Sequence, residues 1–368
     1  MMEALADKLP VAQHVTFKVK MLLDKVVEDR ILASLNFQEG DRVPIWDYID
    51  NYGIYKYFAG DEEDYTKGMV KVYHGLGIDL CRGFGRSFAP SEEGEADDHS
   101  IILGRTRWQT RYPIRTLEDL KRYEPHRLTQ KQIDGWVAHE RRMQELFAPY
   151  TMYVPGGGCG FHATYGLMGL ELFSTAIYYA RDDVERIMWC LNDNGVRLAE
   201  AAAEHNLCPI YFIGDDVAYK RAVMFPPDFL RETFIECLRR TIEPVKNAGI
   251  KTIFHSDGYL MPILDDMIEA GIDGLNPIEP LAGMDIGYLK RRYGKNLVLV
   301  GNVDCSQVLP LGTRDEVVEA TKTCIREASP GGGHFIGSSS EIVPATPVEN
   351  ILAFYDTACE YGKYPIAI

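Results

Sequence analysis

Short apolar runs recur along the chain, and most are followed by a stretch with helical patterning. Continuous apolar runs that end in glycine or polar residues are typical of parallel strands covered on both faces. The predicted strands cover residues 42–47, 77–82, 150–155, 209–216, 251–255, 271–276, 296–303 and 333–337. Eight such runs favour an α/β fold of the (β/α)8 TIM-barrel type over an open, doubly wound sheet.

The segments between the runs indicate how the chain is organised. Helices are predicted over residues 227–248, 261–270, 286–293 and 313–328, and glycine follows the first three of them. Alternating residues in 99–113 predict a hairpin in the loop after the second strand. Because no linker-like segment interrupts the chain, residues 1–368 are predicted to form a single barrel domain, with a helical extension over 1–40.

Composition narrows the class of protein. Apolar residues make up 46% and charged residues 25% of the chain, as in ordinary globular proteins. The net charge of −15 argues against nucleic acid as a partner. The acidic N-terminus lacks a secretory pattern, so a cytoplasmic location is expected. Residues 148–170 carry no formal charge, but their six glycines and two prolines favour strand and loop over a membrane span.

Candidate chemistry gathers directly after the apolar runs, where a TIM barrel places its active site. His255 and Asp257 are the most informative pair, because residues i and i+2 of a strand face the same side. Asp215 and Asp216 are adjacent, so only one can face the barrel interior, and the other is expected to cap a following turn. The predicted catalytic residues are His255, Asp257 and Asp216.

A metal site is the second prediction for these strand ends. The predicted ligands are His255, Asp257, Cys305 and Glu341, which follow the fifth, seventh and eighth runs. The alternative is a histidine satisfied in the core and an aspartate bound to a turn amide. The residues predicted to contact substrate are Trp46, Asp47, Tyr48, Phe161, His162, Asn276 and Asn302, although the aromatic ones could equally belong to ordinary core and surface.

Several segments together resemble the uroporphyrinogen decarboxylase superfamily, which also contains corrinoid-dependent methyltransferases. The matching segments are residues 30–36, 41–46, 255–258, 275–280, 301–304, 311–313 and 344–350. The resemblance covers nearly the whole chain and implies a TIM barrel whose mouth binds a ligand. It also implies a homodimer, by analogy with the decarboxylases.

The chain departs from both branches of this superfamily at the expected site. Decarboxylases have an arginine-bearing segment after the first strand, whereas Asp47 to Tyr52 stand here, so uroporphyrinogen is not expected as a substrate. The resemblance implies that the methyltransferases bind zinc through His-x-Cys after the fifth strand and a cysteine after the eighth. His255 matches the first ligand, while Asp257 and Ser340 replace the two cysteines.

The leading hypothesis is therefore a corrinoid-dependent methyltransferase, assisted by zinc. It would move a methyl group from a methoxylated, in particular aromatic, small molecule to the cobalt of a separate corrinoid protein. Carboxylate ligands make a harder zinc than thiolates do, and this favours an ether oxygen as the group polarised. The alternatives are a decarboxylase-type acid/base enzyme acting on a small carboxylic acid through Asp47, Asp216 and His255, and a non-catalytic ligand-binding member of the fold.

Overall fold

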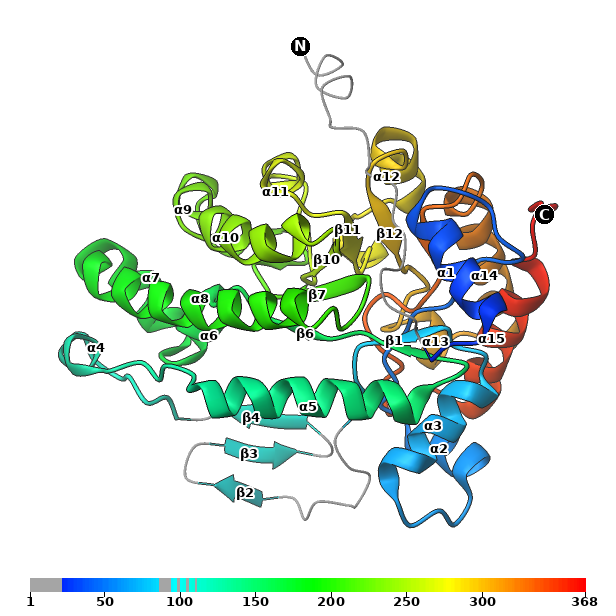
Figure 1. Ribbon diagram of the computed structural model, residues 1–368, viewed down its shortest axis with the longest axis horizontal. Coiled ribbons are helices and arrows are strands. Elements are labelled where there is room, and N and C mark those ends of the chain that lie inside the picture. The colour runs from blue at the N-terminus through cyan, green and yellow to red at the C-terminus, as the bar shows by residue number, and fades with distance from the viewer. Residues whose placement is uncertain (1–21, 86–93, 98–99, 104–105, 110) are drawn as a thin grey trace.

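The computed structural model describes residues 22–85, 94–97, 100–103, 106–109 and 111–368, and Figure 1 shows its elements. Parallel strands form the centre of the molecule. They are β1 (Leu80–Cys81), β5 (Met152–Tyr153), β6 (Gly156–Gly157), β7 (Ile210–Gly214), β10 (Lys251–His255), β11 (Gly274–Asn276), β12 (Val298–Val300) and β13 (His334–Phe335). β1 pairs with β5, and a second sheet runs in the order β13-β12-β11-β10-β7-β6.

The first predicted strand closes this ring through isolated bridges rather than a regular ladder. Ile45 pairs with Ile336 and Trp46 with Leu80, both in parallel. The Trp46 N–H donates to the Ile336 carbonyl over 2.9 Å, and the Ile336 N–H donates to the Pro44 carbonyl over 2.9 Å. The loop before β6 joins in as well, because the Phe212 N–H donates to the Pro155 carbonyl. The predicted TIM-barrel fold is confirmed.

Helices surround the strands and connect most of them. The helices are α1 (Lys25–Leu35), α2 (Tyr52–Ala59), α3 (Tyr65–Gly75), α4 (Leu117–Arg122), α5 (Gln130–Phe147), α6 (Phe161–Gly166), α7 (Gly169–Tyr179), α8 (Arg181–Glu204), α9 (Pro227–Glu232), α10 (Phe234–Asn247), α11 (Leu264–Ala270), α12 (Ile286–Tyr293), α13 (Val308–Leu311), α14 (Arg314–Ala328) and α15 (Val348–Tyr361), with a 3-10 turn η2 (Pro280–Ala282). The helix predicted over 227–248 is divided at Thr233 into α9 and α10. None of the described helices is long and apolar enough to span a membrane.

Two antiparallel pairings lie outside the barrel. β2 (Gly94–Asp97), β3 (Ser100–Leu103) and β4 (Thr106–Gln109) form a small sheet after β1, drawn below α5 in the view of Figure 1. The pairing of β3 with β4 confirms the predicted hairpin, while residues 98–99, 104–105 and 110 lie outside the described residues. β8 (Ala218–Tyr219) and β9 (Ala222–Val223) form a short hairpin after β7.

Helix α1 closes the lower end of the barrel, where the strands begin. Its Val27, Ile31 and Leu35 belong to the same buried cluster as the inward-facing side chains of the strands, among them Ile210 and Phe335. The Ser34 hydroxyl donates to the His334 carbonyl over 2.9 Å, which ties the helix to β13. Of the helical extension predicted over residues 1–40, residues 1–21 lie outside the described part, and α1 occupies much of the rest.

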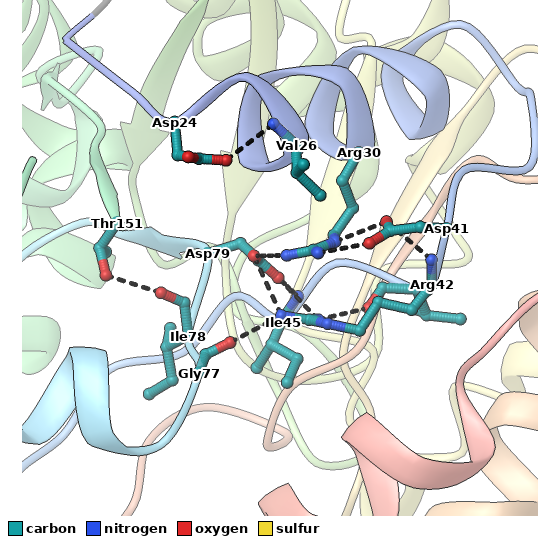
Figure 2. Close-up of polar contacts among 11 residues, drawn as sticks. Asp24, Val26, Arg30, Asp41, Arg42, Ile45, Gly77, Ile78, Asp79 and Thr151 are labelled. Atoms are coloured by element: carbon teal, nitrogen blue, oxygen red, sulfur yellow. Dashed lines mark hydrogen bonds and ion pairs between the residues drawn. The ribbon is translucent and has the colours of Figure 1, made fainter. Parts of the chain in front are cut away.

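A buried ion-pair network lies beside α1 at this lower end (Figure 2). Arg30 contacts one carboxylate oxygen of Asp79 at 2.6 Å, and Arg42 contacts the other at 2.8 Å. The Ile45 N–H also donates to Asp79, and Asp41 pairs with Arg30 from outside. The Asp79 side chain is 2% exposed, so its charge is compensated inside the protein rather than by water.

Candidate functional site

Three polar side chains converge at the opposite end of the barrel, the mouth, where the strands end. Asp216 follows β7, His255 is the last residue of β10, and Asp257 lies two residues later. The parallel register places Gly214 opposite His255, so both strands end at the same level. One ligand atom from each of Asp216, His255 and Asp257 lies within 4.8 Å of the others. The structure thus brings together the residues predicted to be catalytic.

His255 is held in one orientation by its neighbour on β11. Its Nδ1 lies 2.7 Å from Asn276 Oδ1, and since the amide oxygen can only accept, Nδ1 carries the proton. Burial, together with the nearby Arg82 charge, lowers the pKa of His255 to about 4. The imidazole is therefore neutral near pH 7, with its lone pair on Nε2. Asn276, predicted as a substrate contact, orients His255.

Asp257 is a carboxyl group without full compensation. Burial, followed by the charges of Asp216 and Glu279, raises its pKa to about 7. Ser340 donates a hydrogen bond to this carboxylate. The buried Oδ1 atom of Asp257 nevertheless has no hydrogen-bond partner within the described part of the chain. The Asp257 N–H donates to Asp216 Oδ1 over 3.2 Å, which keeps the two acids side by side. A cation at this place would relieve both carboxylates.

The neighbouring aspartates have separate tasks. His162 Nδ1 lies 3.6 Å from Asp216 Oδ2, and the Tyr165 hydroxyl donates to the Asp216 carbonyl over 2.9 Å. Asp215 instead turns away and accepts hydrogen bonds from the backbone N–H groups of Cys159 and His162. It therefore fixes the loop after β6, not a following turn as expected, because that loop presents unpaired amides next to it.

The donor set fits a divalent metal ion. Neutral His255 offers one nitrogen, and Asp216 and Asp257 offer oxygens, a combination typical of zinc or a harder ion. Cys305 and Glu341 are not part of the group of three. The Cys305 N–H donates to Ser339 Oγ, and its thiol lies 3.9 Å from Ser306 Oγ. Their assignment as ligands stays a prediction.

Asp47, predicted to contact substrate, is committed to the fold. Its carboxylate accepts from the Ser338 N–H at 2.8 Å, the Ser338 hydroxyl at 2.7 Å and the Tyr355 hydroxyl at 2.8 Å. The Tyr48 N–H supplies a fourth hydrogen bond. Burial raises the pKa of Asp47 despite these donors. The residue joins the first strand to the loop after β13.

The remaining predicted contacts are spread over different environments. Trp46 lies inside the barrel, edge-on to Phe335 at 5.9 Å between ring centroids. Phe161 is fully buried among aromatic rings that include Phe173 and Phe234. His162, with 48% of its side chain exposed, stays open to solvent beside Asp216. The Asn302 N–H donates to a buried thiol, that of Cys324.

Arg82 is the site residue that the sequence reasoning did not single out. It follows β1 directly, and its guanidinium lies 4.8 Å from the Tyr48 ring centroid and 5.0 Å from that of Phe212. Its charge acts on the pKa values of His255 and Asp257, although burial acts more strongly on both. The only sequence signal for Arg82 was its position directly after an apolar run, which is also where the other site residues lie.

Part of the chain is similar in sequence to known methyltransferases. Over 165 residues the chain is 28% identical to the methylcobamide:CoM methyltransferase MtaA of Methanosarcina barkeri, which covers 44% of this chain and 47% of that protein. Over 156 residues it is 24% identical to the methylated-thiol–coenzyme M methyltransferase of Methanosarcina mazei, covering 42% and 39%. The chain thus matches less than half the length of either relative.

A solved structure extends the likeness of fold to most of the chain. A methyltransferase from Methanosarcina mazei superposes with a TM-score of 0.68 at 21% identity, over 91% of this chain and 98% of that one. Residues 27–361 match the uroporphyrinogen decarboxylase (URO-D) family. This match runs from α1 to the end of α15, and so contains the barrel and every residue of the site. The chain therefore belongs to the uroporphyrinogen decarboxylase family, as its sequence segments predicted.

Proposed function

We propose that this chain is a corrinoid-dependent methyltransferase that moves a methyl group from a methoxylated small molecule, in particular an aromatic one, to the cobalt of a separate corrinoid protein. The observation that carries the proposal is the group of Asp216, His255 and Asp257 at the strand ends. The similarity to methylcobamide:CoM and methylated-thiol methyltransferases supports the reaction class.

Zinc is the metal that we propose for this group. His255 Nε2 and the carboxylates of Asp257 and Asp216 would hold it, and the bound ion would act as a Lewis acid toward an ether oxygen. Asn276 keeps Nδ1 of His255 protonated, so that Nε2 remains a donor. The hydrogen bond from the Asp257 N–H to Asp216 keeps both carboxylates at the same place.

The chemistry of the donors favours an ether over a thiol. Two thiolates and an imidazole make a soft, electron-rich zinc, which suits activation of a thiol as nucleophile. In this chain Asp257 and Ser340 stand at the positions of the two cysteine ligands, and a hydrogen bond joins them. Oxygen ligands leave more positive charge on the ion, which favours departure of an alkoxide or phenoxide when reduced cobalt takes the methyl group.

The test is to mix the purified protein with reduced cobalamin and, separately, methoxyarenes, quaternary amines and thiols. Methylcobalamin formation, followed by the cobalt absorbance, is expected with a methoxyarene. His255→Ala and Asp257→Ala should both lose turnover and bound zinc. Full activity in both variants would remove the mechanism. Faster methylation of a thiol from methylcobalamin than demethylation of any ether would reverse the direction of transfer.

Acid/base catalysis on a small carboxylic acid is the second candidate, and one observation favours it. The pKa of Asp257, raised to about 7 by burial and then by Asp216 and Glu279, suits a group that exchanges protons near neutral pH. This function needs no metal. Release of carbon dioxide from a small acid by protein treated with a chelator would support it over methyl transfer.

A further inference from the structure

Arg82 lies close to two aromatic rings at the mouth of the barrel. Tyr48 and Phe212 each lie within 5.0 Å of its guanidinium carbon, measured to the ring centroids. The Phe212 ring lies in turn 5.6 Å from the His255 ring. Phe212 is therefore a neighbour of both the Arg82 guanidinium and the His255 imidazole.

Other arginines that lie over rings in the described part of the chain also have a carboxylate partner. Arg181 over Phe229 pairs with Glu185 and Glu232, each at 2.7 Å. Arg240 lies over Trp189 and pairs with Asp193 at 2.7 Å. Arg292 lies over Tyr293 and pairs with Asp265 at 3.2 Å. Arg82 differs, because no ion pair or hydrogen bond forms on its guanidinium among the described residues.

Among the described residues, no acceptor binds the guanidinium donors of Arg82. The N–H groups of a guanidinium lie in its plane, so contact of its face with an aromatic ring does not consume them. Its charge lowers the proton affinity of Asp257 and Glu341, although burial dominates both pKa values, so the group belongs electrically to the mouth. A guanidinium that has no acceptor among the described residues is suited to bidentate binding of a carboxylate.

We infer that Arg82 is the specificity-determining residue that binds the anionic group of the substrate, a carboxylate on the same small molecule as the reacting methyl ether. The position of Arg82 beside Phe212, the ring that also neighbours His255, carries this inference. It rests on the proposed function for the identity of the reacting group. Arg82 also explains how an anion approaches a mouth that contains Asp216, Asp257 and Glu279, since its positive charge is fixed there before the ligand arrives.

The test compares two ligands of nearly equal shape, 4-methoxybenzoate and the neutral 4-methoxybenzamide, by isothermal titration calorimetry. The proteins are the wild type, Arg82→Gln, Arg82→Lys and the control Arg181→Gln, whose arginine lies over a ring but has carboxylate partners. Arg82→Gln should weaken benzoate binding by about 10- to 100-fold and change benzamide binding by less than about threefold. Arg82→Lys should give an intermediate loss, and Arg181→Gln none.

Several results would overturn the inference. Equal loss of both ligands in Arg82→Gln would mean that Arg82 only shapes the pocket, and unchanged benzoate binding would mean that it binds nothing. Failure of the wild type to prefer benzoate over benzamide would count against it as well. Thermal unfolding of each variant checks that Arg82→Gln is folded, and Arg82→Lys provides a second variant that keeps the charge.

Failure of the proposed function gives a different pattern. Benzoate binding that depends on Arg82, without methylcobalamin formation from any ether, would refute methyl transfer and leave the anion subsite standing. Methyl transfer from 4-methoxybenzoate with the same kcat/KM in wild type and Arg82→Gln would refute the subsite and leave methyl transfer standing.

Discussion

The lower end and the mouth of the barrel contain similar charged side chains in opposite states. At the lower end, both oxygens of Asp79 are in contact with guanidinium groups, and a backbone amide adds a further hydrogen bond. At the mouth, Asp257 has an oxygen without a partner and Arg82 has no acceptor, within the residues that the structure describes. The same set of barrel strands begins at the lower end and ends at the mouth.

This difference separates charges that stabilise the fold from charges reserved for a ligand. For a compensated buried charge such as Asp79, removal of one partner strongly destabilises the folded protein, because the other charge stays buried without a counter-charge. Uncompensated charges such as Asp257 cost free energy of folding, and a protein retains them where a ligand supplies the missing partner. Substitutions at the two ends should therefore change stability with opposite signs.

The largest effect is expected from Asp79→Ala at the lower end. It leaves Arg30 and Arg42, whose side chains are 10% and 12% exposed, without their shared partner. The free energy of unfolding should fall by about 3–5 kcal/mol in urea titrations. Lys25→Ala is the control, because its pairs with Glu28 and Asp29 are on the surface, and it should change stability by less than about 1 kcal/mol. Similar losses of unfolding free energy in the two variants would show that the Asp79 pairs stabilise the fold no more than surface ion pairs do.

At the mouth, His255→Ala should affect activity rather than stability. We expect methyl transfer to fall by about 100-fold or more, a loss of about 2.7 kcal/mol of transition-state stabilisation, with bound zinc lost in parallel. Asn276→Ala, which removes only the orienting partner, should lower metal affinity by about tenfold. Steady-state kinetics and metal analysis of dialysed protein measure both. Equal effects in the two variants would mean that Asn276 does more than orient His255.

Asp257→Asn should stabilise the metal-free protein. Because the pKa of Asp257 is about 7 when folded, against 3.8 for an ordinary aspartate, the folded state binds the extra proton between these values. This term therefore favours folding at low pH and is lost as the pH rises toward 7 and above. The advantage of the variant over wild type should be near zero at pH 4 and reach about 1–3 kcal/mol at pH 8.

The comparison with wild type is needed because His255 works in the other direction. Its pKa of about 4 when folded lies below the ordinary 6.5, so its contribution to stability rises with pH between these values. The difference between the two proteins removes this shared slope. Urea titrations at several pH values, repeated with excess zinc, measure it. A variant that is less stable than wild type at pH 8 without metal would contradict the reserved state of Asp257.

The smallest effect is expected from Ser34→Ala, which tests the attachment of α1 to the barrel. The Ser34 hydroxyl donates to the His334 carbonyl and accepts from the His334 N–H. Its loss should cost about 1 kcal/mol of stability and leave methyl transfer unchanged. Altered kinetics in this variant would show that the two ends of the barrel are coupled.

The sequence predicted those parts of the molecule that depend on local pattern. The apolar runs gave β7 and β10 nearly in full, and the i, i+2 spacing put His255 and Asp257 at one site with Asp216. Other features depend on partners far away in the chain. From its place at the end of an apolar run, Asp47 is predicted to contact substrate at the mouth. In the structure its carboxylate instead accepts hydrogen bonds from Ser338 and Tyr355, which lie 291 and 308 positions later in the chain. Phe161 likewise lies in an aromatic cluster assembled from several helices, which no local spacing indicates.

The bridge between Asp47 and Ser338 has a consequence for protein synthesis. The first strand can complete its pairing only after residues near 336–355 have left the ribosome. Its partners on that side are Ile336, which bridges to Ile45, and Ser338 and Tyr355, which donate hydrogen bonds to Asp47. At translation rates of about 5–20 residues per second, a separation of 291 residues corresponds to a delay of roughly 15–60 s. During that interval the nascent chain exposes an unpaired strand edge, so we expect it to be a client of chaperones that bind such edges.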